Sequence, residues 1–126
     1  MNPDMLSHLN EENQPRMVDV GGKTVTLRSA RAQSIVSMPP EVSTLFVDGE
    51  LQAKKGPVIQ TAIIAGIMAA KKTSELIPLC HPLRIDAVQV ELTLGRDTVE
   101  IRATVSAFDR TGVEMEAMTA ASVAAL

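Results

Sequence analysis

Aromatic side chains are scarce in this 126-residue sequence, which contains no tryptophan or tyrosine and only two phenylalanines, Phe46 and Phe108. Proteins that bind single-stranded nucleic acid stack its bases on aromatic rings, and this chain has too few rings for such a surface. The formal net charge of −3 also disfavours contact with a phosphate backbone. We therefore expect no nucleic-acid partner.

Cysteine and histidine are equally rare, since Cys80 is the single cysteine and His8 and His81 are the two histidines. One cysteine excludes an internal disulfide framework, and these three residues match no recognised zinc-ligand spacing. Chains without disulfides are typical of reducing compartments. We therefore expect a cytoplasmic protein with no metal and no cofactor.

A long hydrophobic run is also lacking. The longest apolar segment, Pro57 to Ala70, is shorter than the span of a bilayer and is interrupted by glutamine and threonine. The polar N-terminus has neither the basic region nor the apolar region of a signal peptide. No membrane partner is expected.

The residues that are present predict one globular domain, since 45% of them are hydrophobic and the chain is long enough to bury a core. Residues 1–16 are polar and without periodicity, so we expect a flexible N-terminal tail that includes His8. Residues 17–126 then form the single domain.

Periodicity and turn residues predict an α+β fold for that domain. Helical spacing is clearest from Pro57 to Ala70, where small residues would let a neighbouring element approach closely, and an alanine-rich helix follows from Gly112 to Leu126. Between them, the alternating segments Leu83–Leu94 and Val99–Ala107 flank a Gly-Arg-Asp turn and predict a hairpin. Upstream we expect short extended segments around a Gly-Gly turn, at residues 18–20, 23–27 and 32–37. A short helix is expected after them, at residues 39–47. This order favours an antiparallel sheet with helices packed on one face.

The only cysteine and histidine of the domain lie together in a turn between two prolines, Pro78 and Pro82. Each proline fixes its own φ and disfavours helix at the preceding residue, which predicts extended backbone for the three residues between them. Histidine is the residue type most often used to move protons near neutral pH, so His81 is a candidate for that role. The alternative is a core-edge histidine whose nitrogens pair with the backbone, and Cys80 is typical of a small buried hydrophobe.

Two pairs of lysines flank the long helix. Lys54 and Lys55 precede it, where ammonium groups and free backbone N–H groups at a helix start would together favour a phosphate. The alternative is a solvated pair of charges beside a turn. Lys71 and Lys72 follow the helix, where positive charge complements the helix dipole and a structural role is the simpler interpretation.

Two carboxylates occur close together in the segment from Thr111 to Glu116, TGVEME. Thr111 and Glu114 match a Ser/Thr-x-x-Glu capping box, which would give Glu114 a structural role at a helix start. Glu116 is not explained by that motif, and side chains two residues apart point to different sides of a helix. A carboxyl group beside an apolar wall can act as a general acid or base.

Taken together, two long segments closely resemble the MoaC family, the cyclic pyranopterin monophosphate synthases of molybdenum cofactor biosynthesis. They are AAKKTSELIPLCHPL at 69–83 and TGVEMEAMTAASVAAL at 111–126. MVDVGGK at 17–23 and KGPVIQTAIIAGIMAAK at 55–71 also fit, so the resemblance runs from Met17 onward. It implies a ferredoxin-like α+β fold, a homo-hexamer built as a trimer of dimers, and a site formed between subunits.

The resemblance also implies a lyase reaction, in which 3′,8-cyclo-7,8-dihydro-GTP is rearranged to cyclic pyranopterin monophosphate with loss of pyrophosphate. The matched positions assign catalytic roles to Lys55, His81 and Glu114. Substrate contacts are assigned to the Cys-His turn and to the second acidic segment, at Leu79, Cys80, His81, Met115 and Glu116. A triphosphate substrate gives the lysine a purpose, because a cation beside phosphate stabilises its charge.

The C-terminal helix pattern reaches Leu126 without a capping glycine, a basic last turn or a proline. In the family that helix continues into a segment with an essential acidic residue and a lysine, so we expect the principal family acid beyond Leu126. A protein of this length would then be weakly active or inactive. The alternative function is a noncatalytic nucleotide-binding or assembly module.

Overall fold

The protein is built on a three-stranded antiparallel sheet, seen here in a computed structural model that describes residues 9–12 and 14–126. The strands are β1 (Thr26–Ser37), β4 (Ala87–Leu94) and β5 (Thr98–Asp109), in the order β1-β5-β4. The central strand β5 pairs with β1 from Thr98 opposite Ser37 to Asp109 opposite Thr26. It also pairs with β4, which precedes it in the chain and is joined to it by the predicted Gly-Arg-Asp turn.

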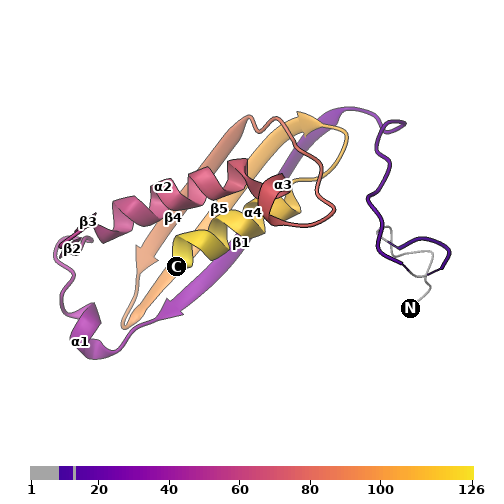
Figure 1. Cartoon of the computed structure of the whole chain (residues 1–126). Coiled ribbons are helices and arrows are strands. Elements are labelled where there is room, and N and C mark those ends of the chain that lie inside the picture. Colours follow the sequence, from indigo (N-terminus) through magenta and orange to yellow (C-terminus); the bar gives the residue numbers. More distant parts are fainter. Residues whose placement is uncertain (1–8, 13) are drawn as a thin grey trace.

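Two long helices, α2 (Val58–Lys71) and α4 (Glu114–Ala125), cover the same face of this sheet (Figure 1). The order β1-α2-β4-β5-α4 and the strand order β1-β5-β4 are those of a ferredoxin-like arrangement, so the predicted fold class is confirmed. The smaller elements are α1 (Pro40–Ser43), β2 (Gln52–Ala53), β3 (Gly56–Pro57) and α3 (Thr73–Leu76). Within the described part of the chain, no helix has both the length and the apolar character needed to cross a membrane.

The core lies between the sheet and the two helices. Alternate residues of β5 point into it and are fully or almost fully buried: Val99, Ile101, Ala103, Val105 and Ala107. The helices approach closely at Gly66 of α2, where an added Cβ would lie 3.1 Å from the carbonyl oxygen of Ala120 and 3.2 Å from Cβ of Ala124. This confirms the prediction that small residues on the long helix permit tight packing.

The N-terminal region differs from the predicted series of short strands. The turn at Gly21-Gly22 is present, with the Asp19 carboxylate accepting a hydrogen bond from Gly21 N at 2.9 Å, but residues 18–20 form no strand. Of the segment expected at 23–27, only residues 26 and 27 are strand; they and the segment expected at 32–37 belong to one continuous strand, β1, because β5 offers a partner of equal length. Of the predicted tail, residues 1–8 and 13 lie outside the described residues, and Leu9 forms an isolated bridge with Pro15.

Two further boundaries differ for identifiable reasons. The helix expected at 39–47 is limited to α1, and Gly49 does not end it; instead Asp48 and Gly49, with φ of 50° and 80°, form a tight turn that pairs Val47 with Glu50. The first strand of the hairpin begins at Ala87 and not at Leu83. The Asp86 carboxylate accepts a hydrogen bond from Phe108 N at 2.9 Å, and the four residues before Ala87 leave the sheet.

Candidate active site

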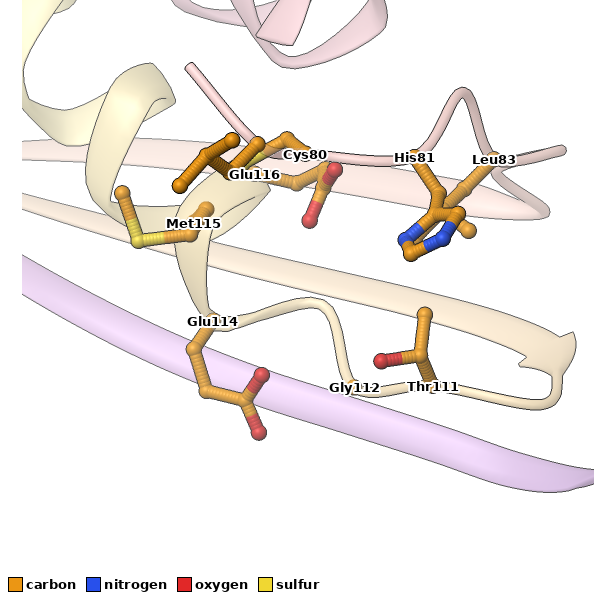
Figure 2. Close-up of a pocket in the computed structure, with 9 residues that line it drawn as sticks. Cys80, His81, Leu83, Thr111, Gly112, Glu114, Met115 and Glu116 are labelled. Carbon is orange, nitrogen blue, oxygen red and sulfur yellow. The ribbon is translucent and has the colours of Figure 1, made fainter. Parts of the chain in front are cut away.

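A small open pocket of about 90 Å³ lies where the Cys-His turn faces the start of α4 (Figure 2). One wall is the turn, with Leu79, Cys80, His81 and Leu83. The other wall is the segment that leads into α4, with Thr111, Gly112, Glu114, Met115 and Glu116. The structure therefore brings together two groups of predicted site residues that are more than thirty positions apart in the sequence. The first group is Leu79, Cys80 and His81, and the second is Glu114, Met115 and Glu116.

The turn itself is held in an unusual backbone conformation. Ile77, before Pro78, is extended as expected, with φ of −110° and ψ of 122°. Leu79 is not extended, because its φ of 66° lies in the left-handed region, and the prediction of extended backbone through this segment is wrong there. A branched residue in that region costs on the order of 1–3 kcal/mol, and such strain occurs often at functional sites.

Glu116 is the buried acid of the pocket. It lies in the first turn of α4, is 4% exposed, and directs its carboxyl group toward the Cys-His turn (Figure 2). Burial raises the pKa of Glu116; a hydrogen bond from its own backbone N–H opposes this in part, and the nearby Glu114 carboxylate adds a smaller increase. A carboxyl group with a raised pKa keeps its proton to a higher pH than an ordinary glutamate does, which suits a general acid.

Cys80 is a partly buried thiol next to that acid. Burial raises the pKa of Cys80, and the negative charge of Glu116 adds to the effect. Only a thiolate is a good nucleophile, so a thiol with a raised pKa is poorly suited to covalent catalysis. The geometry agrees with the interpretation of Cys80 as a packing contact.

Glu114 has no capping role, contrary to the capping-box prediction. The residue before the helix is Val113, no side chain caps the helix start, and Glu114 is the first helical residue. Its carboxylate folds back over Gly112, so closely that a Cβ at Gly112 would collide with it. Glu114 is exposed and points away from Glu116, as the spacing of the two carboxylates predicts (Figure 2).

Three residues that line the pocket, Leu83, Thr111 and Gly112, are absent from the predicted site. Their positions inside the two matched segments were the only available signal. Gly112 is needed because its missing side chain makes room for the Glu114 carboxylate. The imidazole of His81 faces Thr111 across the pocket (Figure 2).

Lys55 is far from this pocket within one chain. It belongs to the turn between β2 and β3, at the start of α2, whereas the Cys-His turn follows the other end of that helix (Figure 1). The 14 residues of α2 span about 21 Å. The structure therefore separates Lys55 from the other predicted site residues.

Both Lys54 and Lys55 are exposed. The ion pairs found among the described residues join Arg84 to Asp86 and Arg102 to Glu100, and neither involves these lysines. Their ammonium groups are therefore available to an anion. No group of three or more His, Cys, Asp or Glu side chains within the described residues could hold a metal ion.

The pocket is too small to enclose a nucleotide. Sites for ligands of that size measure roughly 300–1,000 Å³, several times the 90 Å³ found between the turn and α4. Within one chain it can therefore accept a part of such a ligand, such as a ring edge, while the rest extends into the open side.

Comparison with known proteins points in one direction. The model of the MoaC family matches residues 17–126. A protein named cyclic pyranopterin monophosphate synthase from Streptomyces avermitilis is 55% identical over 123 residues, which cover 98% of this chain and 71% of that protein. Cyclic pyranopterin monophosphate synthase 3 from Mycobacterium tuberculosis is 57% identical, over 97% of this chain and 68% of its own length. A synthase of the same name from Xanthomonas oryzae is 52% identical, over 96% and 74%.

Proposed function

The chain belongs to the MoaC family, and we propose that it is a cyclic pyranopterin monophosphate synthase. It converts 3′,8-cyclo-7,8-dihydro-GTP to cyclic pyranopterin monophosphate and releases pyrophosphate, an early step of molybdenum cofactor biosynthesis. The observation that carries this proposal is the identity of more than half the residues to synthases of that name across nearly the whole chain.

The pocket is the part of the site that handles the ring system of the substrate. Glu116, whose pKa is raised by burial, can bind polar ring atoms and exchange a proton with them. His81 orients the ring or moves a second proton from the opposite wall, and Glu114 supplies a further carboxylate at the pocket rim. Leu79, Cys80 and Met115 provide apolar contact to the ring.

Lys55 is the part of the site that handles the triphosphate. An exposed ammonium group without a carboxylate partner binds a phosphate oxygen through a charge-assisted hydrogen bond. It also stabilises the charge that accumulates on pyrophosphate as this group leaves. Lys54, one position earlier, adds positive charge to the same turn.

These two parts meet only if two copies of the chain form the site. The length of α2 and the small volume of the pocket both support this arrangement. In a two-fold symmetric pair each copy contributes the same surface, so the Lys55 turn of one copy faces the pocket of the other, twice. The assembly we propose is a homo-hexamer made of three such dimers.

The proposed setting is the cytoplasm, with a small-molecule substrate and with no metal, cofactor, nucleic acid or membrane as partner. The single cysteine fits a reducing compartment. In this proposal the pocket residues bind the ring system of the substrate and Lys55 binds its triphosphate, so no further group is needed for binding.

Turnover of the cyclised GTP derivative by the purified full-length protein tests the function. We expect product formation by the wild type, and folded but nearly inactive Lys55→Ala and His81→Ala variants, with circular dichroism as the control for folding. Wild-type rates in both variants would refute the assigned site. Calorimetric binding of the substrate without product formation would instead indicate a noncatalytic nucleotide-binding module.

A further inference from the structure

The first turn of α2 is capped by a carboxylate from outside the helix. One oxygen of Glu50 accepts hydrogen bonds from Leu51 N at 2.8 Å and from Ile59 N at 2.7 Å. The other oxygen accepts one from Gln60 N at 3.1 Å. Ile59 and Gln60 are in the first helical turn, where backbone N–H groups have no partner within the helix.

The residue that normally caps a helix cannot do so here. Pro57 occupies the N-cap position of α2, and its side chain has no hydrogen-bond acceptor. Serine, threonine, aspartate or asparagine would serve at that position. Glu50, which is nine residues before Ile59 and on the other side of the lysine turn, supplies the missing acceptor.

Glu50 therefore closes the segment that carries Lys55. The tight turn at Asp48-Gly49 delivers Glu50, with Val47 N donating to Glu50 O at 2.8 Å. The chain then forms the small hairpin of β2 and β3, in which Ala53 pairs with Gly56, and Val58 N donates to Leu51 O at 3.0 Å. The incoming limb of the hairpin is tied to the helix start by the Glu50 carboxylate and by this backbone bond.

We propose that Glu50 is a positioning residue for Lys55, which it orients by fixing the β2–β3 hairpin to the first turn of α2. The inference rests on the proposed function, because it gives Lys55 the role of binding the phosphate groups of the substrate. Glu50 itself touches neither substrate nor product.

The charge of Glu50 suits this role. Burial opposes its ionisation, but hydrogen bonds from the backbone N–H groups of Ile59, Leu51 and Gln60 outweigh that effect and lower the pKa of Glu50. The carboxylate is thus ionised at neutral pH and engaged by the backbone. It makes no ion pair with Lys54 or Lys55 within the described residues, so their charge stays available to phosphate.

A double-mutant cycle tests the proposal. The affinity for inorganic pyrophosphate, by calorimetry, and kcat/KM are measured for wild type, Glu50→Gln, Lys55→Ala and the double variant. We expect Glu50→Gln to lower both quantities by about tenfold or more, as misplaced groups do, and to add almost nothing when Lys55 is already alanine. Glu41→Gln, which removes an exposed carboxylate at the start of α1, is the matched control and should change neither.

A second variant separates positioning from simple helix capping. Replacing Pro57 by Asp in the Glu50→Gln protein gives α2 a side-chain cap but does not restore the Glu50 carboxylate that ties the hairpin to the helix start. We expect this double variant to recover the melting temperature and not the kcat/KM. Recovery of both would overturn the proposal, because capping alone would then account for Glu50.

The outcomes distinguish this inference from the function on which it rests. If Lys55→Ala keeps wild-type pyrophosphate affinity, the phosphate-binding role of Lys55 is wrong and the positioning role falls with it. If Lys55→Ala loses affinity but Glu50→Gln does not, or if the two losses add, only the Glu50 proposal is overturned. Faster hydrogen exchange at the amides of Ile59 and Gln60 in Glu50→Gln is the expected structural signature, and unchanged exchange would contradict it.

Discussion

The two ends of helix α2 use a glutamate in opposite ways. Beyond its C-terminal end, Glu116 is buried in a pocket, and the pKa of this carboxyl is raised. At its N-terminal end, Glu50 accepts backbone hydrogen bonds, and the pKa of this carboxyl is lowered. The difference shows that environment sets the pKa of a carboxyl group: Glu116 is removed from water and has only its own backbone N–H as a donor, whereas Glu50 is surrounded by several backbone donors.

The same contrast holds for exposure. The pocket places a strained turn against a helix start, and its acid is almost inaccessible. The hairpin keeps its lysines in solvent and fixes only their backbone. Proton transfer requires an environment that shifts a pKa, while phosphate binding requires an unpaired cation that can reach its ligand.

The largest expected effect comes from removing the chemical group at either end. Glu116→Gln should lower kcat by about 10²–10⁴-fold, the usual contribution of a general acid or base. Lys55→Ala should lower kcat/KM by about 10²-fold or more through loss of phosphate stabilisation. Steady-state kinetics would measure both effects. Near-normal turnover in either variant would show that the substituted residue is not part of the active site.

Packing of α2 against α4 is expected to give the next largest effect. Gly66→Leu would force a side chain into a space where even a Cβ would lie 3.2 Å from Cγ2 of Val90 and 3.1 Å from the carbonyl oxygen of Ala120. Overpacking of this kind costs about 1–3 kcal/mol. Urea denaturation would measure the free energy of unfolding, with Ile64→Leu at an exposed position of the same helix as the control. An unchanged midpoint would mean that the helices are less closely packed than described.

The stability of the two glutamate variants should depend on pH in opposite ways. The pKa of Glu116 is raised in the folded protein, so its ionisation opposes folding above that pKa and the penalty disappears as the pH falls. Glu116→Gln should therefore melt at a higher temperature than wild type at neutral pH. This gain should shrink as the pH falls toward 4.5, the ordinary value for glutamate.

The pKa of Glu50 is lowered, so its stabilisation is complete above 4.5 and is lost as the pH falls through its folded pKa. Glu50→Gln should melt at a lower temperature than wild type at neutral pH, and the deficit should shrink only below pH 4.5. Calorimetric scans from pH 3 to 8, a range chosen to span both windows, would check both variants. If the melting temperatures of the two variants at neutral pH changed in the same direction relative to wild type, the proposed contrast between Glu116 and Glu50 would be wrong.

The smallest expected effect concerns the strained turn. Leu79→Gly would relieve the positive φ, a gain of about 1 kcal/mol, and would remove a side chain that is 36% exposed. The two effects oppose each other, so the free energy of unfolding should change by less than about 1 kcal/mol. A loss several times larger would show that Leu79 packs more firmly than its exposure indicates.

Much of this fold is readable from the sequence because its pattern is strong. The small-residue helix before Lys71, the hairpin around Gly95 and the alanine-rich C-terminal helix all appear close to their predicted positions. The length of β1 was not readable, because it depends on pairing with β5, seventy or so residues away. Strand length is decided by the partner as much as by local alternation.

The candidate site was only partly readable for a related reason. Motifs identified the Cys-His turn and the second acidic segment, and the structure brings them together. They did not reveal that Glu50 caps helix α2, since this depends on how the preceding loop folds back. The capping-box motif was misleading because the helix starts at Glu114, so Thr111 lies too far upstream to cap it.

The central claim, that two copies of the chain complete each site, is tested most directly by subunit complementation. Lys55→Ala and Glu116→Gln chains, each nearly inactive alone, are coexpressed with different tags. In a two-fold pair one site per hybrid dimer regains both residues, so random assembly should restore roughly a quarter of wild-type turnover. His81→Ala mixed with Glu116→Gln is the control, because both changes affect the same pocket and no site is repaired. Turnover that stays at the sum of the parent variants in the first mixture would contradict the account.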